Sequence, residues 1–513
     1  MYRLVMALPV LGMLAPVPDA EGAPSVEINS YVMVQPIVVR GDDGRDPAKF
    51  GRVEPLIDQA YAAAGVDLRF FEPIFFDNTV ARDGKIDGDT MVADARRAGI
   101  LRGDGAIINL FVVREINRRR VATRRSQPPE WVAFVALADD ESVARGAAGV
   151  ARELGHVLGL DRTGEALTRV PVLTTAQVRI IRRSPLIQSR VKCLDVESGR
   201  RVILDESIEP YFSALHPREM AAVTGGVVKG NSLAARRAET RRRFGEAVLS
   251  FTPAEEETLT WFVSRIREQL GTDYPLLTDQ PWRFLKVEGW VCGGLPHTRG
   301  TCILLNAPAL KWLVAIRKRA VGPEVGSVLG LLVHEQMHVL QRFYPRRFAG
   351  LYRDVMGLIQ GDIAPHPWLT ERHVHNPDAP RLEWVFPLEN DAGEVQHLGV
   401  WTLLRGEHPV PVMGQDFLSV AVPLSEENGR FLVRVDEHDV PMHQPSQAYA
   451  DARRKLPTRH GLDHPNELAA YAFEELVRER LTAVENRHQA RGAKSSTGAV
   501  MDQFGAWCRT HLK

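Results

Sequence analysis

The chain has 513 residues, too many for one ordinary hydrophobic core, so two or more domains are expected. Its 64 Lys and Arg residues balance 64 Asp and Glu residues, which excludes a global positive field that would recruit nucleic acid or an anionic membrane surface. After the N-terminus no apolar run is long enough to cross a bilayer, so no integral membrane segment is expected.

Residues 1–23 have the pattern of a secretory signal peptide, with an early Arg3, a short apolar run and small residues at the exit. They predict a secreted or periplasmic protein, whose cysteines meet an oxidising compartment. Cys292 and Cys302 bracket a turn-rich segment between two strand-like runs, so a disulfide across a hairpin is expected there. Cys193 and Cys508 pair or stay free.

The first third of the chain alternates β-rich runs with helical ones, and it is expected to form a domain over residues 24–197. The expected strands are Val26–Val39, Val66–Phe76, Ile107–Val113 and Trp131–Ala138, and the expected helices are Val53–Ala64 and Ser142–Leu158.

The last of these helices ends in a degenerate metal-binding signature. The run from Arg152 to Arg162 resembles the His-Glu-x-x-His-x-x-Gly-x-x-His signature of the metzincin peptidases, above all the matrixin-like ones, and Glu153, His156 and Gly159 agree with it. Arg152 and Arg162 stand where the first and third histidines belong, and a cationic guanidinium does not ligate a metal ion. The resemblance therefore implies a metal-free metzincin fold that serves as a scaffold or substrate-binding module. An unrelated α/β domain is the alternative.

Residues 198–245 are expected to connect this domain to a second one over 246–513. A β-like run from Val191 to Leu204 leads into this segment, and its basic run at 236–243 lacks interleaved aromatics, so it is interpreted as a solvated helix face. In the second domain, His297 and Arg299 are expected to be exposed turn residues.

The strongest motif of the chain is His334-Glu335-Gln336-Met337-His338, within an apolar helix expected to begin at Gly322-Pro323 and end at Tyr344-Pro345. Residues four apart share one helix face, so His334 and His338 present two imidazoles to one zinc ion (Zn²⁺). Glu335 lies beside that ion without being a ligand and is predicted to act as a general base.

Glu467 is the preferred third ligand. The run from Asn466 to Tyr471 resembles the second motif of the gluzincin peptidases, Asn-Glu-x-x-Ala/Ser, in which a helical Glu completes the zinc site. The resemblance implies that Tyr471, four positions on, supports a ligand histidine or acts on the substrate, although thermolysin-like members have an acid there. The competing ligands are three loop histidines, His366, His373 and His375.

A β-rich insertion at about 382–440 is expected between the two metal-binding helices, because several strand-like runs separate His338 from Glu467. The predicted fold class is therefore α+β and multidomain: a degenerate metzincin-like domain followed by a mostly helical, gluzincin-like domain with that insertion.

The predicted function is zinc-dependent hydrolysis of a peptide or protein substrate, with Tyr471, Tyr344 or His464 steadying the oxyanion. The substrate backbone is expected to add along the strand that precedes the His-Glu helix. The alternatives are a zinc hydrolase acting on a non-peptide amide or ester, and an exported binding or scaffold protein without activity.

Overall fold

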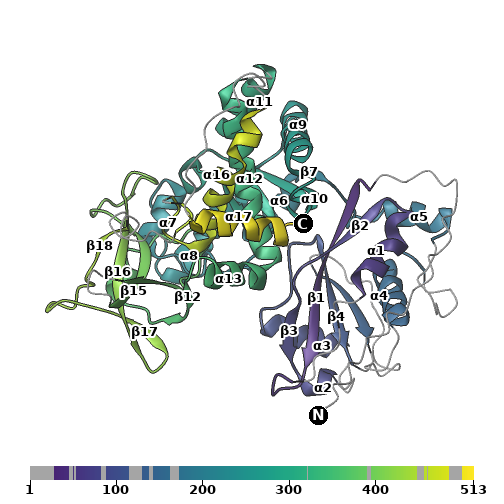
Figure 1. The fold of residues 1–513 in the computed structure, drawn as a ribbon, viewed down its shortest axis with the longest axis horizontal. Helices are drawn as coiled ribbons and strands as arrows, with labels where there is room; N and C mark the ends of the chain where they lie inside the picture. The colour runs from purple at the N-terminus through teal and green to yellow at the C-terminus, as the bar shows by residue number, and fades with distance from the viewer. Residues whose placement is uncertain are drawn as a thin grey trace, which may run out of the picture.

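The computed structural model describes residues 28–45, 50, 53–82, 88–114, 130–137, 143–161, 173–319, 322–389, 394–446, 456–458, 460–483 and 499–513. The expected signal peptide, residues 1–23, lies outside them. Helices and strands are mixed throughout the described chain, as the predicted α+β class requires. Figure 1 shows three parts side by side: an N-terminal sheet at the right, a helical centre that contains the C-terminus, and a β-rich part at the left.

A mostly parallel sheet forms the N-terminal part, in the order β2-β1-β4-β5, with β3 and β6 also paired to β1. The long central strand β1 bonds β2 with its first half and β3 with its second half, so the run predicted as one strand over 66–76 is divided in two. The strands are β1 (Ser30–Arg40), β2 (Val66–Phe70), β3 (Ile74–Asp77), β4 (Ile107–Val113), β5 (Trp131–Ala136) and the antiparallel β6 (Gln188–Ser189).

Helices cover both faces of this sheet, because its strands are apolar on both sides. One apolar cluster joins the sheet to α1 (Glu54–Ala62), α4 (Val143–Val157) and α5 (Thr175–Arg182), and another joins the opposite face to α2 (Thr79–Arg82) and α3 (Gly88–Arg97). The predicted helices at 53–64 and 142–158 are confirmed as α1 and α4.

A second sheet, in the order β10-β11-β9-β7 with β8 beside β9, lies in the centre of the molecule. Its strands are β7 (Val191–Cys193), β8 (Val248–Leu249), β9 (Trp282–Val287), β10 (His297–Arg299) and β11 (Cys302–Asn306). The β-like run predicted over 191–204 is wrong beyond Cys193. Asp195 there accepts a hydrogen bond from the Ser198 amide and so caps a helix.

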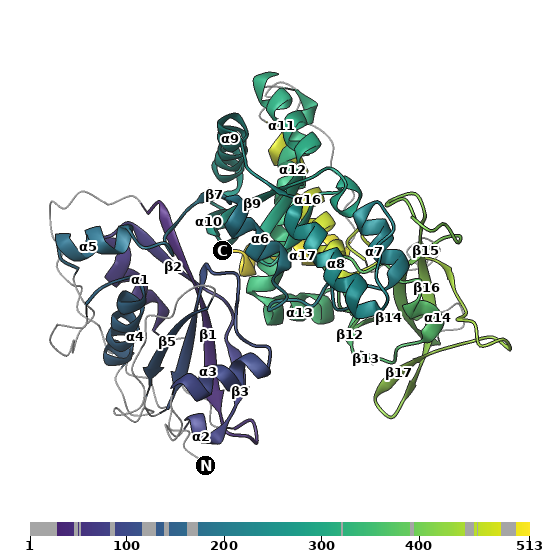
Figure 2. The same cartoon turned by 180° about the vertical axis from the view of Figure 1, so that it is seen from behind.

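Helices span the expected connecting segment, residues 198–245. They are α6 (Val196–Leu204), α7 (Pro217–Thr224) and α8 (Leu233–Glu246), and they share a core with strands β9 and β11 (Figure 2). Strand β7, which lies within the expected first domain, pairs with β9 of the second sheet.

The predicted hairpin disulfide is wrong. Strands β9 and β11 pair in parallel, so the chain crosses between them through the short 3₁₀ helix η1 (Val291–Gly294) and β10. Cys292 and Cys302 are both buried and free, and Cys193 and Cys508 are free as well. The expected exposure of His297 and Arg299 is also wrong: both lie on β10, with exposed fractions of only 2% and 1%.

Helices α12 (Pro323–Phe343) and α16 (Pro465–Ala483) pack together at the centre and carry the motif residues. Gly322 caps α12 and Pro323 opens it, as predicted. Apolar residues of both helices belong to the largest core cluster, with contributions from the surrounding α9 (Pro253–Leu270), α10 (Pro275–Asp279), α11 (Ala307–Arg319), α13 (Pro345–Asp354) and α17 (Ala499–His511).

The predicted β insertion is present. A sheet in the order β12-β14-β15-β16-β17-β13, with β18 beside β16, follows α13. One of its faces joins the central core through Trp384 and Val400, and the other has a core of its own around Trp401 and Phe431. Its elements are β12 (Ile359–Gln360), β13 (Asp362–Ile363), α14 (Pro367–Thr370), β14 (Trp384–Glu389), β15 (Val395–Leu404), β16 (Phe417–Glu427), β17 (Arg430–Val433) and β18 (Gln444–Pro445).

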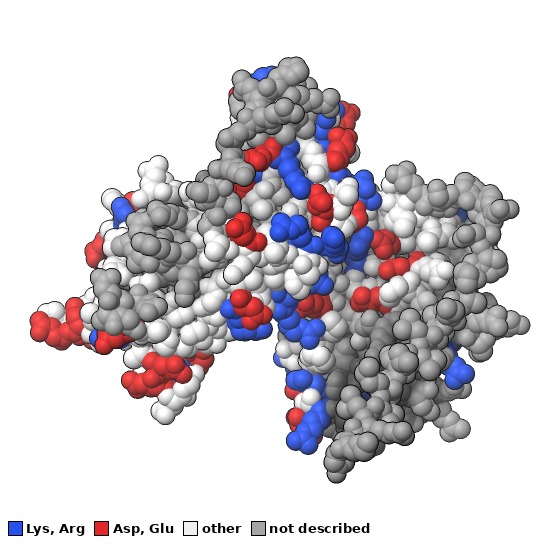
Figure 3. Space-filling view, in the orientation of Figure 1, with Lys and Arg blue, Asp and Glu red and all other residues white. Residues whose placement is uncertain are grey.

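The N-terminal sheet shares apolar core with the central helices through Met33, Phe71 and Ile107. A buried ion pair between Asp104 and Arg283, 2.8 Å long, also crosses this junction. Basic and acidic side chains lie next to one another over the middle of the face in Figure 3, as expected from their equal numbers. Among the described residues, no helix combines the length and apolar character needed to cross a membrane.

Candidate metal centre

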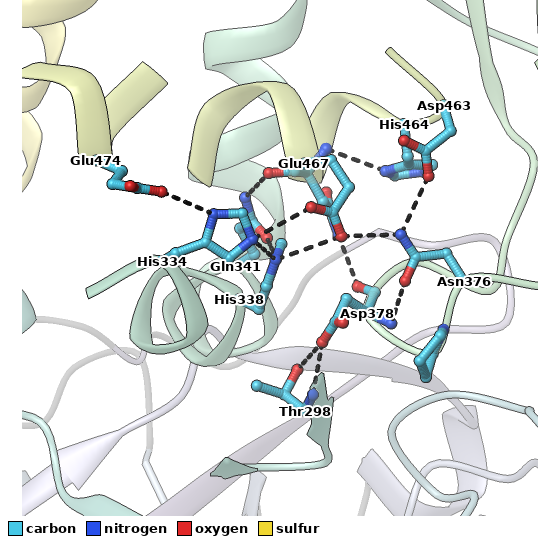
Figure 4. Close-up of polar contacts among 12 residues, drawn as sticks. Thr298, His334, His338, Gln341, Asn376, Asp378, Asp463, His464, Glu467 and Glu474 are labelled. Carbon is cyan, nitrogen blue, oxygen red and sulfur yellow. Dashed lines mark hydrogen bonds and ion pairs between the residues drawn. The ribbon is translucent and has the colours of Figure 1, made fainter. Parts of the chain in front are cut away.

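His334, His338 and Glu467 come together at the contact of α12 and α16, with ligand atoms all within 4.8 Å of one another. The two Nε2 atoms lie 3.1 Å apart, and the Glu467 carboxylate lies 3.2 Å from His334 Nε2 and 3.5 Å from His338 Nε2. All three residues are buried, and Figure 4 shows their side chains pointing toward one another. This group could hold a metal ion.

Two glycines allow the helices and the loop before α16 to approach this closely. Gly330, one turn before His334, lies where an added Cβ would come within 3.1 Å of the Glu474 carboxylate. Gly461 has φ +65°, and an added Cβ there would meet Glu467 Cβ at 2.6 Å. A side chain at either position would therefore push Glu474 or Glu467 away from the histidines.

Gln341 determines which nitrogen of His338 faces the cluster. The Gln341 amide nitrogen donates to the Asn466 carbonyl oxygen (2.9 Å), so its amide oxygen is the atom that faces His338 Nδ1 at 2.8 Å. An oxygen accepts, so Nδ1 carries a proton, and Nε2 is the nitrogen directed at Glu467 and His334.

Glu474 has the corresponding role for His334. Its carboxylate lies 3.9 Å from His334 Nδ1, from a position two helical turns after Glu467. Because Nδ1 has no hydrogen-bond partner within the described chain, the anion of Glu474 favours a proton there and leaves the Nε2 lone pair for a metal. The sequence pattern predicts this support at Tyr471, one turn earlier.

The electrostatics of the three residues favour positive charge between them. Burial would lower the pKa of His338, but the adjacent Glu467 carboxylate outweighs burial and raises that pKa to about 10. Burial would likewise raise the pKa of Glu467, yet His338 and His334 hold it well below the usual range. These shifts show that the site favours positive charge. A proton on His338 meets that preference, and a divalent cation that displaces this proton would be ligated by both imidazoles and the Glu467 oxygen.

A loop after α14 holds the third ligand from the other side. The Asn376 amide donates to Glu467 Oε1 (2.8 Å) and to Asp463 Oδ2 (3.2 Å), which leaves Glu467 Oε2 directed at His334. Asp378 in the same loop accepts the backbone N–H of Thr298 on β10 (2.7 Å). The loop thus ties α16 to the edge of the central sheet (Figure 4).

The contact with Asp378 occupies the position beside β10 where the substrate backbone is expected to add. Strand β10 is at the edge of its sheet, but the outward amide of its middle residue, Thr298, already donates to Asp378. Arg342 of α12 also donates to the Thr298 hydroxyl. An extended substrate cannot add a further strand there without displacing this loop.

Glu335 faces a cavity of about 530 Å³ that also reaches His334 and Glu467. The side chain is 3% exposed, and its Oε2 has no hydrogen-bond partner among the described atoms. Burial, together with the nearby Asp378 carboxylate, raises the pKa of Glu335 to about 7. A carboxylate with that pKa takes up and releases protons near neutral pH.

Tyr471 lies in the same cavity and is 37% exposed. Its ring packs edge-on against the His334 ring, with centroids 4.4 Å apart, so it contacts the ligand without a hydrogen bond in the described chain. Burial and the Glu467 carboxylate raise the pKa of Tyr471 to about 12, which keeps the phenol protonated and able to donate.

The other two residues expected to steady the oxyanion are Tyr344 and His464, and neither is among the described residues that line this cavity. The Tyr344 hydroxyl accepts a hydrogen bond from the Gln280 amide (2.9 Å). His464 Nδ1 accepts the Asn466 N–H (3.0 Å) at the start of α16, and burial lowers the pKa of His464 to about 3.

None of the three rival histidines joins the ligand group. His366 lies 3.7 Å from Asp439 in the β insertion, and His373 is buried beside β15. His375 lines the cavity, but its Nδ1 contacts the Glu219 carboxylate at 3.0 Å.

The expected degenerate site on α4 holds no ligand group within the described residues. Arg152 is exposed and pairs with Glu153 at 3.2 Å, and His156 Nδ1 lies 3.1 Å from the Leu160 carbonyl oxygen. Arg162 lies outside the described residues.

Comparison of the chain with known protein families, with curated proteins and with solved structures gave no significant match. The class that the fold and the site define is a mixed helix-and-strand protein with a buried centre of two histidines and one glutamate that could hold a metal ion.

Proposed function

We propose that this protein is a zinc-dependent peptidase. The observation that carries the proposal is that His334, His338 and Glu467 converge beside a buried Glu335 in one cavity. Two imidazoles and one carboxylate are a ligand set of catalytic zinc sites, which keep a fourth position for water or substrate. These three residues would hold a zinc ion, which would supply Lewis acidity toward the substrate carbonyl and toward water.

The chain's own residues would divide the remaining work. Glu335 takes a proton from the attacking water and returns it to the leaving amine, a task that suits a carboxyl group whose pKa is about 7. Tyr471 remains protonated and donates from the cavity wall toward the oxyanion. Gln341 and Glu474 keep the ligand nitrogens directed at the metal.

Two coarser expectations belong to the same proposal. Export as a secreted or periplasmic protein is supported by residues 1–23 alone. A metal-free, metzincin-like role for the N-terminal domain is supported by Arg152 and Arg162 at two ligand positions.

The substitution Glu335→Gln tests the proposal, because it keeps the volume and removes the base. We expect zinc to stay bound at one ion per chain while peptide turnover falls by a factor on the order of 100 to 10,000. Metal content by elemental analysis and cleavage of a quenched-peptide library give the two measurements. Unchanged peptide cleavage by Glu335→Gln would refute the mechanism.

The same measurements separate the alternatives. A chain that binds zinc but cleaves only ester or non-peptide amide substrates is the hydrolase of the first alternative. A chain that binds no metal is the scaffold protein of the second.

A further inference from the structure

We propose that a second cavity, at the joint between the N-terminal part and the helical centre, binds a small organic molecule that carries two or more phosphate or carboxylate groups. The side chains that would hold these groups are Arg102, Arg353 and Arg381. The inference goes beyond the proposed function and does not depend on it, because no described residue lines both this cavity and the metal cavity.

The cavity has a volume of about 700 Å³, which is within the range of small-molecule sites. The N-terminal part contributes Ile74 of β3 and Arg102 to its wall. The centre contributes α13, which lies beside β3 in Figures 1 and 2. The segment between α6 and α7 and the loop before β14 complete the wall. The cavity is therefore built from several parts of the chain, and a ligand in it would contact all of them.

Arginine side chains dominate the charge of this cavity. Five of the described residues that line it are arginines and two are glutamates. Two of these arginines are paired, Arg342 with Glu209 at 2.7 Å and Arg346 with Glu72 at 3.3 Å. The three that form no ion pair with a described residue are Arg102, Arg353 and Arg381. One lining carboxylate, Glu383, remains beside these three cations, so the lining has a surplus of two positive charges.

Arg102 is held in place by neutral groups. Its Nε donates to Gln35 Oε1 (3.0 Å), and its Nη1 donates to the Ser207 carbonyl oxygen (2.7 Å). Its Nη2 makes no hydrogen bond to a described residue, and it is not one of the buried polar atoms that lack a partner. The guanidinium is thus fixed in position, and one of its nitrogens is accessible to a ligand in the cavity that Arg102 lines.

The charge of Arg102 is also poorly compensated. Burial lowers the pKa of Arg102 to about 10, although three nearby carboxylates act in the opposite direction, and the positive charge of Arg381 acts in the same direction as burial. Arg102 and Arg381 are therefore close enough to repel each other. An anion between them would offset both the loss of hydration and the repulsion. Guanidinium groups bind phosphates and carboxylates through paired N–H donors, which gives the ligand its chemical class.

The distribution of the three arginines indicates more than one anionic group. Arg102 belongs to the N-terminal part, Arg353 to α13 and Arg381 to the loop before β14, so the donors approach from three elements. Apolar side chains such as Phe348 and Trp384 line the space as well. A single inorganic ion would leave most of this space empty, whereas a carbon skeleton with several anionic groups would contact both kinds of side chain.

The test measures the binding of fructose 1,6-bisphosphate and of tricarballylate to the full chain by isothermal titration calorimetry. Ionic strength is held constant, and both the zinc-loaded and the metal-free chain are titrated. We expect at least one of the two anions to bind at one site per chain with the same Kd in both forms, and the one that binds more tightly identifies phosphate or carboxylate as the preferred group. Fructose, which lacks the phosphates, should not bind.

Three substitutions locate the site. Arg353→Gln and Arg381→Gln change exposed side chains, so folding should be unaffected, and each should weaken binding on the order of tenfold through the loss of a charge-assisted hydrogen bond. Arg102→Gln should weaken it at least as much. Arg434→Gln changes an exposed arginine of the β insertion outside the cavity, and this matched control should bind as the parent does. A saturating anion should also raise the urea midpoint of the parent more than that of Arg381→Gln.

Three results would overturn the inference: binding of neither anion, equal affinities in the parent and in the cavity variants, or a Kd that changes with zinc and so places the anion at the metal. Binding of an acidic peptide but of neither small anion would also overturn it, in favour of a protein partner. If Arg102→Gln does not fold, the two exposed variants decide the result. None of these measurements uses peptide cleavage, so failure of the proposed function would leave them interpretable.

Discussion

At the residue scale, the group that supports His334 is Glu474, which lies one turn later in α16 than the position that the sequence pattern predicts. The position four residues after Glu467 holds Tyr471, which packs its ring on His334. The carboxylate that faces His334 Nδ1 comes from Glu474, seven residues after Glu467 on the same face of α16. Residue spacings of four and seven both return to one face, so the sequence pattern alone does not separate them.

Glu474→Gln removes the anion that keeps a proton on His334 Nδ1. We expect zinc affinity to fall by about 10- to 100-fold, the usual range for groups that orient a metal ligand. Competition with a chelating indicator dye measures the affinity. Glu475→Gln, at the exposed neighbouring position, is the control and should bind zinc as the parent does. Equal affinities in the parent and in Glu474→Gln would contradict the role.

Glu467→Gln should have a larger effect, because a neutral amide replaces the anionic ligand. We expect zinc binding to weaken well beyond the effect of Glu474→Gln, whereas His366→Ala should leave it unchanged. The same dye competition compares the three variants. If Glu467→Gln binds zinc as strongly as the parent, another residue must be the third ligand.

The residues that hold the ligands show what a sequence can predict. The pair His334 and His338 follows from helix geometry, and Glu467 follows from a motif, so the amino-acid sequence is enough to propose all three. Asn376 and Asp378 have no such signal, because their loop reaches the site only once it packs against α12 and α16. Gln341 lies three residues after His338 on α12, but the direction of its amide depends on the Asn466 carbonyl oxygen of α16. Burial of His297 and Arg299 likewise depends on the neighbours of β10.

At the scale of secondary-structure elements, α1 and β2 bring two carboxylates together in the N-terminal part. Asp58 accepts the Leu68 amide (3.3 Å), and burial, followed by the nearby Asp67 carboxylate, raises the pKa of Asp58 to about 7. In the unfolded chain its pKa is about 3.8. Between these two pKa values, Asp58 holds a proton in the native state that it has released in the unfolded state. The contribution of Asp58 to the free energy of unfolding therefore falls as pH rises from about 4 to about 7, and it stays constant above pH 7.

Asp58→Asn removes this ionisation and keeps an oxygen for the Leu68 amide. The urea midpoint of the variant relative to the parent should therefore rise between pH 4 and pH 7 and then stay constant. Urea titrations at several pH values, followed by circular dichroism, provide the comparison. A difference that is the same at pH 4.5 and pH 7.5 would show that Asp58 does not titrate in this interval.

The elements also differ in how well local pattern predicts them. Strands β15 and β16 and helix α12 are predictable because their apolar periodicity and caps are local. The sequence predicts β9 and β11 as a hairpin, yet they pair in parallel across η1 and β10. Strand direction depends on which partner is available in the sheet, and a sequence of short apolar runs does not contain that information.

At the scale of the whole molecule, the ion pair of Asp104 and Arg283 joins the N-terminal part to the central sheet, with both side chains 2% exposed. Asp104→Asn leaves a buried guanidinium without its counter-ion, and we expect the free energy of unfolding to fall by about 3–5 kcal/mol. Asp362→Asn, which breaks the exposed pair with Arg430, should cost less than about 1 kcal/mol. Urea denaturation of both variants measures the difference. Similar decreases in the free energy of unfolding would show that the pair of Asp104 and Arg283 stabilises the protein no more than an exposed pair does.

The length of the chain predicts more than one domain, whereas no local pattern in the sequence predicts the contacts that join the parts of the structure. Contacts such as Glu72 N–H to the Phe343 carbonyl oxygen (2.8 Å) connect residues 271 positions apart, and no local pattern marks them.

The wide separation of the ligands along the chain also affects when the metal centre can exist. The ribosome completes His334 and His338 well before Glu467, because the whole β insertion is translated between them. A nascent chain that ends within the insertion carries two imidazoles without the carboxylate that completes their site, so it holds zinc weakly. The proposed peptidase would therefore acquire its metal, and with it any capacity to damage neighbouring proteins, only when little of its own chain is left to be made.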